Sequence, residues 1–94
     1  MIKRKKEKAD VEALNSHFMR IPRMDASTAR DLLDLGFSRI YELAGRSPEA
    51  LYESLKEKNP DIPPLKLHLL RMAVYYAEAS DPDPRKLRPE VWMD

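Results

Sequence analysis

The chain has no cysteine, and only two of its 94 residues are glycines, Gly36 and Gly45. Without cysteine it has no disulfide framework, no thiolate ligand for zinc and no cysteine nucleophile. Residues typical of strands are also few, with three Val, four Ile and one Thr against twelve Leu and nine Ala. This balance favours helices over strands. The longest apolar run, residues 72–77, is far shorter than the roughly 20 residues that cross a bilayer.

Length and composition predict one small domain. A chain of 94 residues is below the size at which a single core usually divides into two. Apolar residues make up 43% of the sequence, which is enough to form a core. No apolar segment follows the basic start, so we expect no secretory signal. The composition therefore predicts a cytoplasmic protein with no membrane partner.

The net charge of +1 conceals an asymmetry along the chain. Residues 1–8 carry a net charge of +4, whereas the remainder carries −3. We interpret residues 1–9 as a flexible basic arm that could contact phosphate groups in a salt-dependent manner. The alternative is a solvated terminus that only aids solubility.

A first helix is predicted between Asp10, a candidate N-cap, and the step from Ile21 to Pro22. Proline should end this helix because it pushes the preceding residue out of the α conformation. Apolar residues spaced by three and four positions indicate one buried helical face. The side chains expected on that face are Val11, Leu14 and Phe18.

Four further helices are predicted, which gives about five helices within a domain of residues 10–80. N-cap residues begin the first three of them, and the loop of residues 61–64 leads into the last. The two glycines end two of these helices because glycine accepts a positive φ. The last helix, with Leu65, Leu69 and Met72 on its inner face, is apolar over a wide arc typical of a central element. The expected boundaries are Asp25 or Ser27 to Gly36, Ser38 to Gly45, Ser47-Pro48 to Asn59, and Leu65 to Ala79.

Residues 81–94 are predicted to form an irregular C-terminal tail. The run Asp81-Pro82-Asp83-Pro84 breaks helical order, because proline removes backbone donors. The tail still contains Leu87, Val91 and Trp92. We therefore expect it to pack back onto the domain through Trp92.

The sequence contains no recognisable catalytic or metal-binding constellation. His17 and His68 lie in different predicted helices and have no further ligands at the spacing of a zinc site. There is no glycine-rich phosphate loop, nucleophile elbow or HExxH motif. We expect a protein that is not an enzyme and that uses no cofactor and no metal.

One segment resembles a helix-hairpin-helix motif. The residues Ile21-Pro22-Arg23-Met24-Asp25 are similar to its hairpin, usually Ile-Pro-Gly-hydrophobic-Gly. The residues Ala26-Ser27-Thr28-Ala29 are similar to the Pro-Lys-Thr-Ala that follows. In that motif the glycines let main-chain N–H groups approach a DNA phosphate at a helix N-terminus. The resemblance implies DNA binding without sequence preference, because phosphate contacts carry no base information.

Longer segments resemble one narrower family, the small bacterial "pathogenicity locus" proteins, also described as mitomycin-resistance-like helix-hairpin-helix proteins. The similar segments are residues 35–43, 47–55, 71–77 and 82–92, and the resemblance covers about residues 18–94. It implies a compact all-α bundle of the SAM-like, helix-hairpin-helix type. DNA binding is inferred for this family mainly from the motif.

The hairpin departs from the family pattern where phosphate would bind. Arg23 and Asp25 occupy the two glycine positions, and Ser27 occupies the usual lysine position. Asp25 places a negative charge where an anion should bind, whereas the Arg23 guanidinium could bind phosphate directly. The alternative is that Arg23 is a solvated turn residue and Asp25 is simply an N-cap.

Two functions stay open from the sequence. The first is weak binding to the DNA backbone, motivated by the family resemblance and by the basic arm, and a continuous electropositive face around Arg20, Arg23 and Arg30 would support it. The second is a protein–protein interaction module in which the hairpin is only structural, and this would show as an exposed apolar patch. For the first function, the predicted nucleic-acid-binding residues are Arg20, Arg23, Met24, Ser27, Thr28 and Arg30.

Overall fold

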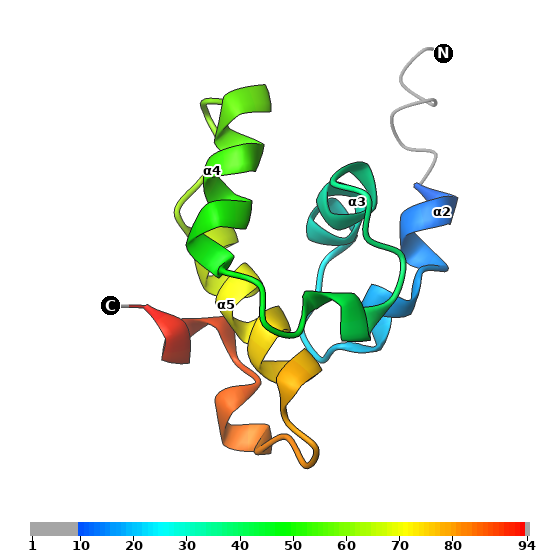
Figure 1. The fold of residues 1–94 in the computed structure, drawn as a ribbon, viewed down its shortest axis with the longest axis vertical. Coiled ribbons are helices and arrows are strands. Elements are labelled where there is room, and N and C mark those ends of the chain that lie inside the picture. The colour runs from blue at the N-terminus through cyan, green and yellow to red at the C-terminus, as the bar shows by residue number, and fades with distance from the viewer. Residues whose placement is uncertain (1–9, 94) are drawn as a thin grey trace.

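In the computed structural model, residues 10–93 are described, and this part of the chain contains helices and no strand (Figure 1). No helix in that range is long and apolar enough to span a membrane. The predicted basic arm, residues 1–9, lies outside the described residues. The α-helices are α2 (Val11–Leu14), α3 (Ala26–Asp34), α4 (Pro48–Lys58) and α5 (Leu65–Glu78). The 3-10 helices are η1 (His17–Arg20), η2 (Ile40–Leu43), η3 (Pro84–Lys86) and η4 (Pro89–Trp92).

Helix α5 lies at the centre of the fold and contacts α3, α4, η2 and η4 (Figure 1). Its wide apolar arc explains this position, because a helix with apolar residues on several faces can be covered from several sides. The buried apolar residues of α5 are Leu69, Leu70, Met72, Ala73 and Val74.

The first turn of α5 differs from the sequence prediction. Leu65, expected on the inner face, is half exposed, whereas the neighbouring Lys66 is only 6% exposed. Consecutive residues on a helix point about 100° apart, so only one of the two can face α3. Lys66 takes the inner position because α3 offers it polar partners.

The predicted first helix is wrong in length, because the chain forms two short helices there. Helix α2 ends at Leu14, and η1 begins at His17 after a turn in which the Ser16 hydroxyl donates to the Ala13 carbonyl oxygen at 2.7 Å. This turn breaks the helical period on which the expected buried face depended. Phe18 is fully buried, but Leu14 is 44% and Val11 63% exposed.

The predicted third helix is also different, because η2 is a single 3-10 turn that begins after Arg39 rather than Ser38. Glu42 stabilises the N-terminus of η2, because the backbone N–H groups of Ser38 and Arg39 donate to Glu42 Oε1 at 2.7 and 2.9 Å. These two hydrogen bonds lower the pKa of the Glu42 carboxyl, because they favour its charged form. The chain therefore has four α-helices plus 3-10 turns among its described residues, and not five similar helices.

Several helix ends match the sequence prediction because their signals are local. Asp25 Oδ1 accepts the Thr28 N–H at 2.8 Å, and Ser47 Oγ accepts the Ala50 N–H at 3.1 Å. Gly36 ends α3 with φ +99°, so the positive φ predicted there is confirmed.

The C-terminal segment lies against α5 (Figure 1). Leu87 is buried, and the Trp92 ring lies 5.3 Å from the Tyr75 ring, centroid to centroid. The Trp92 Nε1–H donates to the Lys86 carbonyl oxygen at 2.8 Å. Two short 3-10 helices, η3 and η4, give this segment more order than the irregular tail that was predicted.

Candidate functional site

The turn of residues 21–25 keeps a left-handed residue at the position where the resembled motif has its first glycine. Arg23 has φ +67° and is the one non-glycine residue with positive φ in the described chain. A side chain with a Cβ is strained there, because the Cβ approaches the carbonyl oxygen. Arg23 is exposed, whereas Ile21 and Met24 on either side are buried. The burial of these two neighbours holds the turn in place.

Replacing Arg23 with glycine should therefore leave the free energy of unfolding unchanged or raise it by up to about 1 kcal/mol. Glycine relieves the backbone strain, and this gain offsets the greater conformational entropy that glycine gives the unfolded chain. The matched control is Arg20→Gly, at a helical position with negative φ, which should lower it by about 1 kcal/mol. Urea denaturation followed by circular dichroism measures both. Equal destabilisation by the two substitutions would contradict a strained Arg23.

The N-terminus of α3 is already occupied by a carboxylate of the chain itself. Asp25 Oδ1 accepts the Thr28 N–H in the place where an external anion would bind. Asp25 has φ −109°, an ordinary value that needs no glycine. Asp25 therefore acts as the N-cap of α3. Its negative charge would repel a phosphate group from the N-terminus of this helix.

A lysine from α5 fills the space beside this helix start. Lys66 Nζ lies 3.0 Å from Ser27 Oγ, 3.1 Å from Thr28 Oγ1 and 2.8 Å from Asp31 Oδ2. These three partners match the three N–H donors of an ammonium group. Ser27 stands at the lysine position of the resembled motif, so Lys66 brings a positive charge from another helix to that place. The charge is buried and paired, and it joins α5 to α3.

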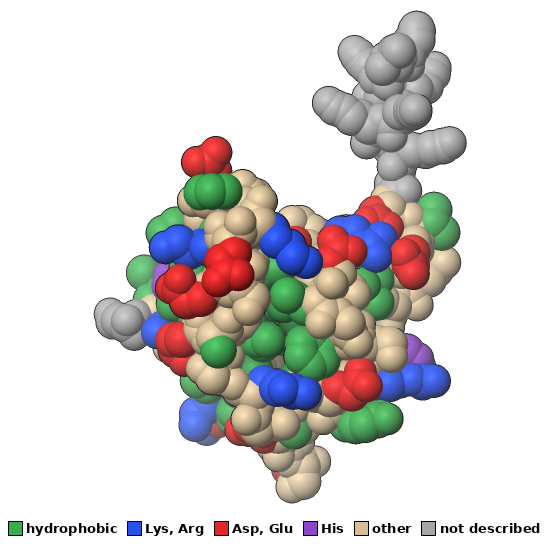
Figure 2. Space-filling view, turned by 45° about the horizontal axis from the view of Figure 1, so that its top comes forward, with side chains coloured by type: hydrophobic (Ala, Val, Ile, Leu, Met, Phe, Trp, Pro, Cys, Tyr) green, Lys and Arg blue, Asp and Glu red, His purple; other side chains and the backbone are tan. Residues whose placement is uncertain are grey.

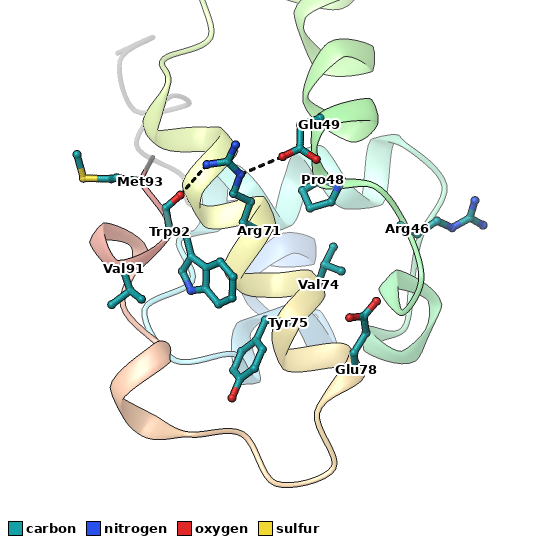
Figure 3. A pocket seen from close by; sticks show the side chains of 10 residues that line it. All are labelled: Arg46, Pro48, Glu49, Arg71, Val74, Tyr75, Glu78, Val91, Trp92 and Met93. Atoms are coloured by element: carbon teal, nitrogen blue, oxygen red, sulfur yellow. Dashed lines mark hydrogen bonds and ion pairs between the residues drawn. The ribbon is translucent and has the colours of Figure 1, made fainter.

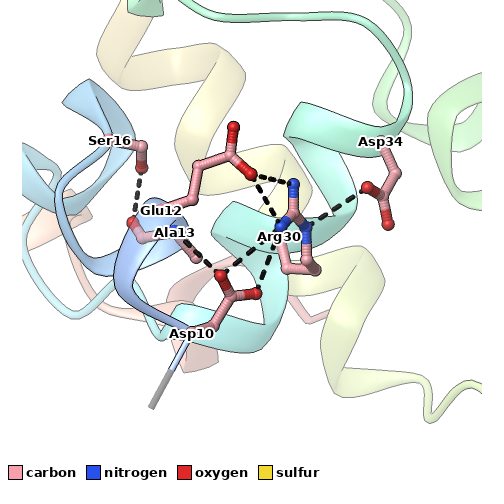
Figure 4. A network of polar contacts seen from close by, with 6 residues as sticks. All are labelled: Asp10, Glu12, Ala13, Ser16, Arg30 and Asp34. Carbon is pink, nitrogen blue, oxygen red and sulfur yellow. Dashed lines mark hydrogen bonds and ion pairs between the residues drawn. The ribbon is translucent and has the colours of Figure 1, made fainter. Parts of the chain in front are cut away.

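Arg30 lies in a cluster of acidic side chains (Figure 4). Its guanidinium contacts Glu12 at 3.0 Å, Asp34 at 3.2 Å and Asp10 at 3.4 Å. The hydrogen bond to Glu12, with the charges of Asp10 and Asp34, raises the pKa of Arg30 above its ordinary value. Three carboxylates around one guanidinium leave the cluster with a net negative charge. Its effect is to hold α2 against α3.

The six predicted nucleic-acid-binding residues thus differ in whether their side chains are available to a ligand. Arg20 and Arg23 are exposed, but Met24 and Thr28 are buried and their side chains do not reach the surface. Ser27 contacts Lys66. Arg30 is paired with the carboxylates of the acidic cluster. On the face drawn in Figure 2, basic and acidic side chains alternate, and apolar side chains gather in the middle between α4 and α3. This face has no continuous positive surface.

A second candidate site is a cavity of about 620 Å³ on α5, which we call the α5 pocket (Figure 3). Its floor is one face of α5, because residues 71, 74, 75 and 78 follow helical spacing. Its walls come from the segment before and at the start of α4 and from η4. The lining residues are Arg46, Pro48, Glu49, Arg71, Val74, Tyr75, Glu78, Val91, Trp92 and Met93.

Trp92 forms a fixed aromatic wall of the α5 pocket. Its indole N–H donates to Lys86, its ring packs on Tyr75, and its carbonyl oxygen accepts from Arg71 Nη1 at 2.7 Å. Val91 and Met93, on either side, are 46% and 57% exposed. The pocket therefore combines an ordered indole with exposed apolar side chains at its edge.

The charged groups of the α5 pocket differ in how they are engaged. Arg71 Nε contacts Glu49 Oε2 at 3.1 Å. Arg46 points away from the cavity in Figure 3, with its guanidinium 5.2 Å from the centre of the Phe37 ring. Glu78 Oε2 accepts the Gly45 N–H at 2.7 Å, and no lysine or arginine within residues 10–93 pairs with it. The lining of the pocket therefore has two arginines and two glutamates, and no net charge.

Nothing in the sequence indicated this pocket directly, since its residues come from three separate segments. The available signal was the apolar group Val91, Trp92 and Met93 in a polar tail, which predicted packing and not a cavity. His17 Nε2 lies 3.1 Å from Arg39 Nη1, and His68 is half-buried on α5. Neither histidine belongs to a metal-binding group, and residues 10–93 contain no cluster of three or more ligating side chains.

Comparison with known proteins identifies a family. A model of the family described as "Pathogenicity locus" matches residues 12–92. No curated protein and no solved structure matches the chain.

Proposed function

The chain belongs to the pathogenicity-locus family, and we propose that it is a non-catalytic, cytoplasmic helix-hairpin-helix domain that binds a segment of another protein. The hairpin would be residues 21–25, between η1 and α3. In this proposal the hairpin is structural, and the α5 pocket is the binding site. The observation that carries it is the cavity of about 620 Å³ beside exposed Val91 and Met93.

The start of α3, directly after the hairpin, supports a structural role because its polar side chains already have partners inside the chain. Asp25 caps α3, and Lys66 contacts Ser27, Thr28 and Asp31. A phosphate group at this place would have to displace the Asp25 carboxylate from the Thr28 N–H. Such displacement costs both the existing hydrogen bond and the repulsion between two anions.

The α5 pocket supports peptide binding because of its size and its lining. Ligand sites are typically clefts of about 300–1,000 Å³ with apolar walls and a few polar groups that orient the ligand. Here Pro48, Val74 and Trp92 are the apolar walls, and Glu49 and Glu78 are the polar groups. The exposed side chains of Val91 and Met93 extend the apolar surface beyond the cavity, where flanking residues of a peptide could pack.

Selection from a displayed peptide library against the full chain tests this function. We expect selected peptides whose affinity falls about tenfold in the double variant Val91→Ser/Met93→Ser, since about 1.4 kcal/mol of apolar contact is removed. Val11→Ser, at an exposed apolar residue of α2, is the matched control and should leave the affinity unchanged. If no selected peptide distinguishes the pocket variant from the control, the proposed function is wrong.

DNA binding is the second candidate, and the observation in its favour is that Arg20, at the end of η1, and Arg23, in the hairpin, are both exposed. A salt titration of labelled duplex and single-stranded DNA separates the two functions. If the hairpin binds phosphate, Arg23→Ala reduces the salt dependence by about one charge, and Asp25→Asn, which keeps the cap, strengthens binding. Identical titrations for these variants and the natural chain would exclude the hairpin as a DNA site.

A further inference from the structure

We propose that a second copy of the chain occupies the α5 pocket when no partner segment is bound. The two copies are related by a two-fold axis, so the same surface of each copy contacts the other. This inference uses the pocket of the proposed function and adds a competing occupant to it. Three features carry it: a hollow beside protruding apolar side chains, one free charge of each sign at the rim, and a lining without net charge.

The α5 pocket has a hollow and a protrusion on the same surface. The hollow is the cavity of about 620 Å³. Val91 and Met93, at its edge, are 46% and 57% exposed and point away from Val74 and Tyr75 on its floor (Figure 3). A two-fold contact needs both features, because the protrusion of each copy must fit the hollow of the other. Methionine suits this role because its unbranched, flexible side chain adapts to an irregular cavity.

Two of the four charged side chains that line the pocket are paired with each other. Arg71 Nε contacts Glu49 Oε2 at 3.1 Å. Lys86 lies over an aromatic ring of α5 and does not line the cavity. The charges that remain for a ligand are therefore those of Arg46 and Glu78, one of each sign.

Arg46 and Glu78 form no ion pair with each other or with any other side chain of residues 10–93. The Arg46 guanidinium lies over the Phe37 ring, and Glu78 Oε2 accepts the Gly45 N–H. Glu42 is near enough for the charge of Arg46 to act on it, but one of its carboxylate oxygens is held by two backbone N–H groups. Both charges at the rim are therefore available to a second molecule.

A two-fold axis brings these two charges together. When Arg46 of one copy faces Glu78 of the other, the same contact repeats on the far side of the axis, so both charges of each copy are paired. A ligand with charge of a single sign would instead be repelled by one of the two side chains. The equal numbers of arginines and glutamates in the lining therefore suit a second copy of the same surface.

The dimer is expected to be weak and to depend on concentration. The lining has ten residues, whereas a stable interface usually has about 20–30 on each side. The chain should therefore dissociate on dilution, and a partner segment in excess should displace the second copy. Sedimentation equilibrium of the full chain measures the dissociation constant. The emission of Trp92, the single tryptophan of the chain, should change over the same range of concentration.

The apolar part of the contact is tested by the double variant Val91→Ser/Met93→Ser. Each copy loses apolar contact that corresponds to about tenfold in affinity, and the two-fold axis makes this contact twice. The dissociation constant of the dimer should therefore rise about a hundredfold. Val11→Ser, at an exposed apolar residue outside the pocket, is the matched control and should leave it unchanged.

Reversed charges test the pairing across the axis. Arg46→Glu and Glu78→Lys should each raise the dissociation constant at least about tenfold, because each turns two attractive contacts into two repulsive ones. An equimolar mixture of the two variants should dimerise at least about tenfold more tightly than either alone, because one copy then has two negative side chains at the rim and the other has two positive ones. Arg20→Glu and Glu57→Lys, at exposed residues outside the pocket, are the matched controls and should have no effect.

Two results would overturn this inference: a monomer at every concentration, or a mixture no tighter than its components. Glu78→Lys also loses the acceptor of the Gly45 N–H, so circular dichroism must show that it folds. If it does not fold, Arg46→Glu is compared with Arg46→Gln, and equal dissociation constants for these two would exclude the charge pairing. Selected peptides could bind a monomer, which leaves the proposed function intact. A dimer without any selected peptide would contradict the proposed function alone.

Discussion

Replacing Lys66 with methionine is expected to lower the free energy of unfolding by about 3 kcal/mol, near the lower end for the loss of one partner of a buried ion pair. Methionine keeps the length of the side chain but removes the ammonium. Asp31 Oδ2, at 2.8 Å from Nζ, would lose its ion pair, and Thr28 Oγ1 would lose a hydrogen-bond donor in a fully buried position. The Asp31 side chain is partly exposed, so water limits the loss.

Urea denaturation measures this effect, and two further variants show its cause. Lys58→Met, at an exposed residue of α4, should change the free energy of unfolding by less than about 0.5 kcal/mol. The double variant Lys66→Met/Asp31→Asn should recover at least about 1 kcal/mol relative to Lys66→Met, because it removes the unpaired charge. A double variant as unstable as Lys66→Met would show that the ion pair is not the cause.

Replacing Phe18 with alanine is expected to lower the free energy of unfolding by about 4 kcal/mol, the usual range for Phe→Ala in a core being about 3–5 kcal/mol. Phe18 is fully buried in η1 and belongs to the same core as Ile21 and Leu32. The loss combines the favourable free energy of burying the ring, which the alanine variant lacks, with the cost of a cavity that the surrounding residues do not fill. For a domain of this size it is a large part of the total stability.

Leu14→Ala tests the position of the core against the sequence pattern. Apolar spacing places Leu14 on the same buried face as Phe18, but the Leu14 side chain is 44% exposed. The structure therefore predicts a loss below about 1 kcal/mol. If Phe18→Ala does not fold, Phe18→Leu, which should cost about 1.5 kcal/mol, provides the comparison by urea denaturation. Equal losses at the two positions would support the single long helix and contradict the turn at Ser16.

Helix ends were predictable where the signal and its partner are neighbours in sequence. Asp25 and Ser47 each accept an N–H from three residues further on, and Gly36 takes a positive φ directly after α3. These interactions depend on local geometry alone, so the residue types are sufficient to predict them. The central position of α5 was predictable for a similar reason, because its apolar arc is continuous in the sequence.

Elsewhere the sequence pattern was misleading because distant contacts outweighed local propensity. The spacing of Val11, Leu14 and Phe18 is compatible with one helix, yet the chain turns at Ser16. The burial of Lys66 depends on Ser27, Thr28 and Asp31, which lie in another helix. A lysine on an apolar helix gives no sign of such partners in the sequence.

The sequence by itself determined that the chain is helical, that α5 is central and where the capped helices begin, since composition, periodicity and capping act within a few residues. It also determined that the turn of residues 21–25 lacks the glycines of the resembled motif. Only the tertiary structure decided which charges are available and where a cavity lies. Lys66 pairs with Asp31, and residues 46–49, α5 and η4 converge around Trp92. Both arrangements join segments that are far apart in the chain. Such contacts depend on the packing of whole helices, which no local pattern specifies.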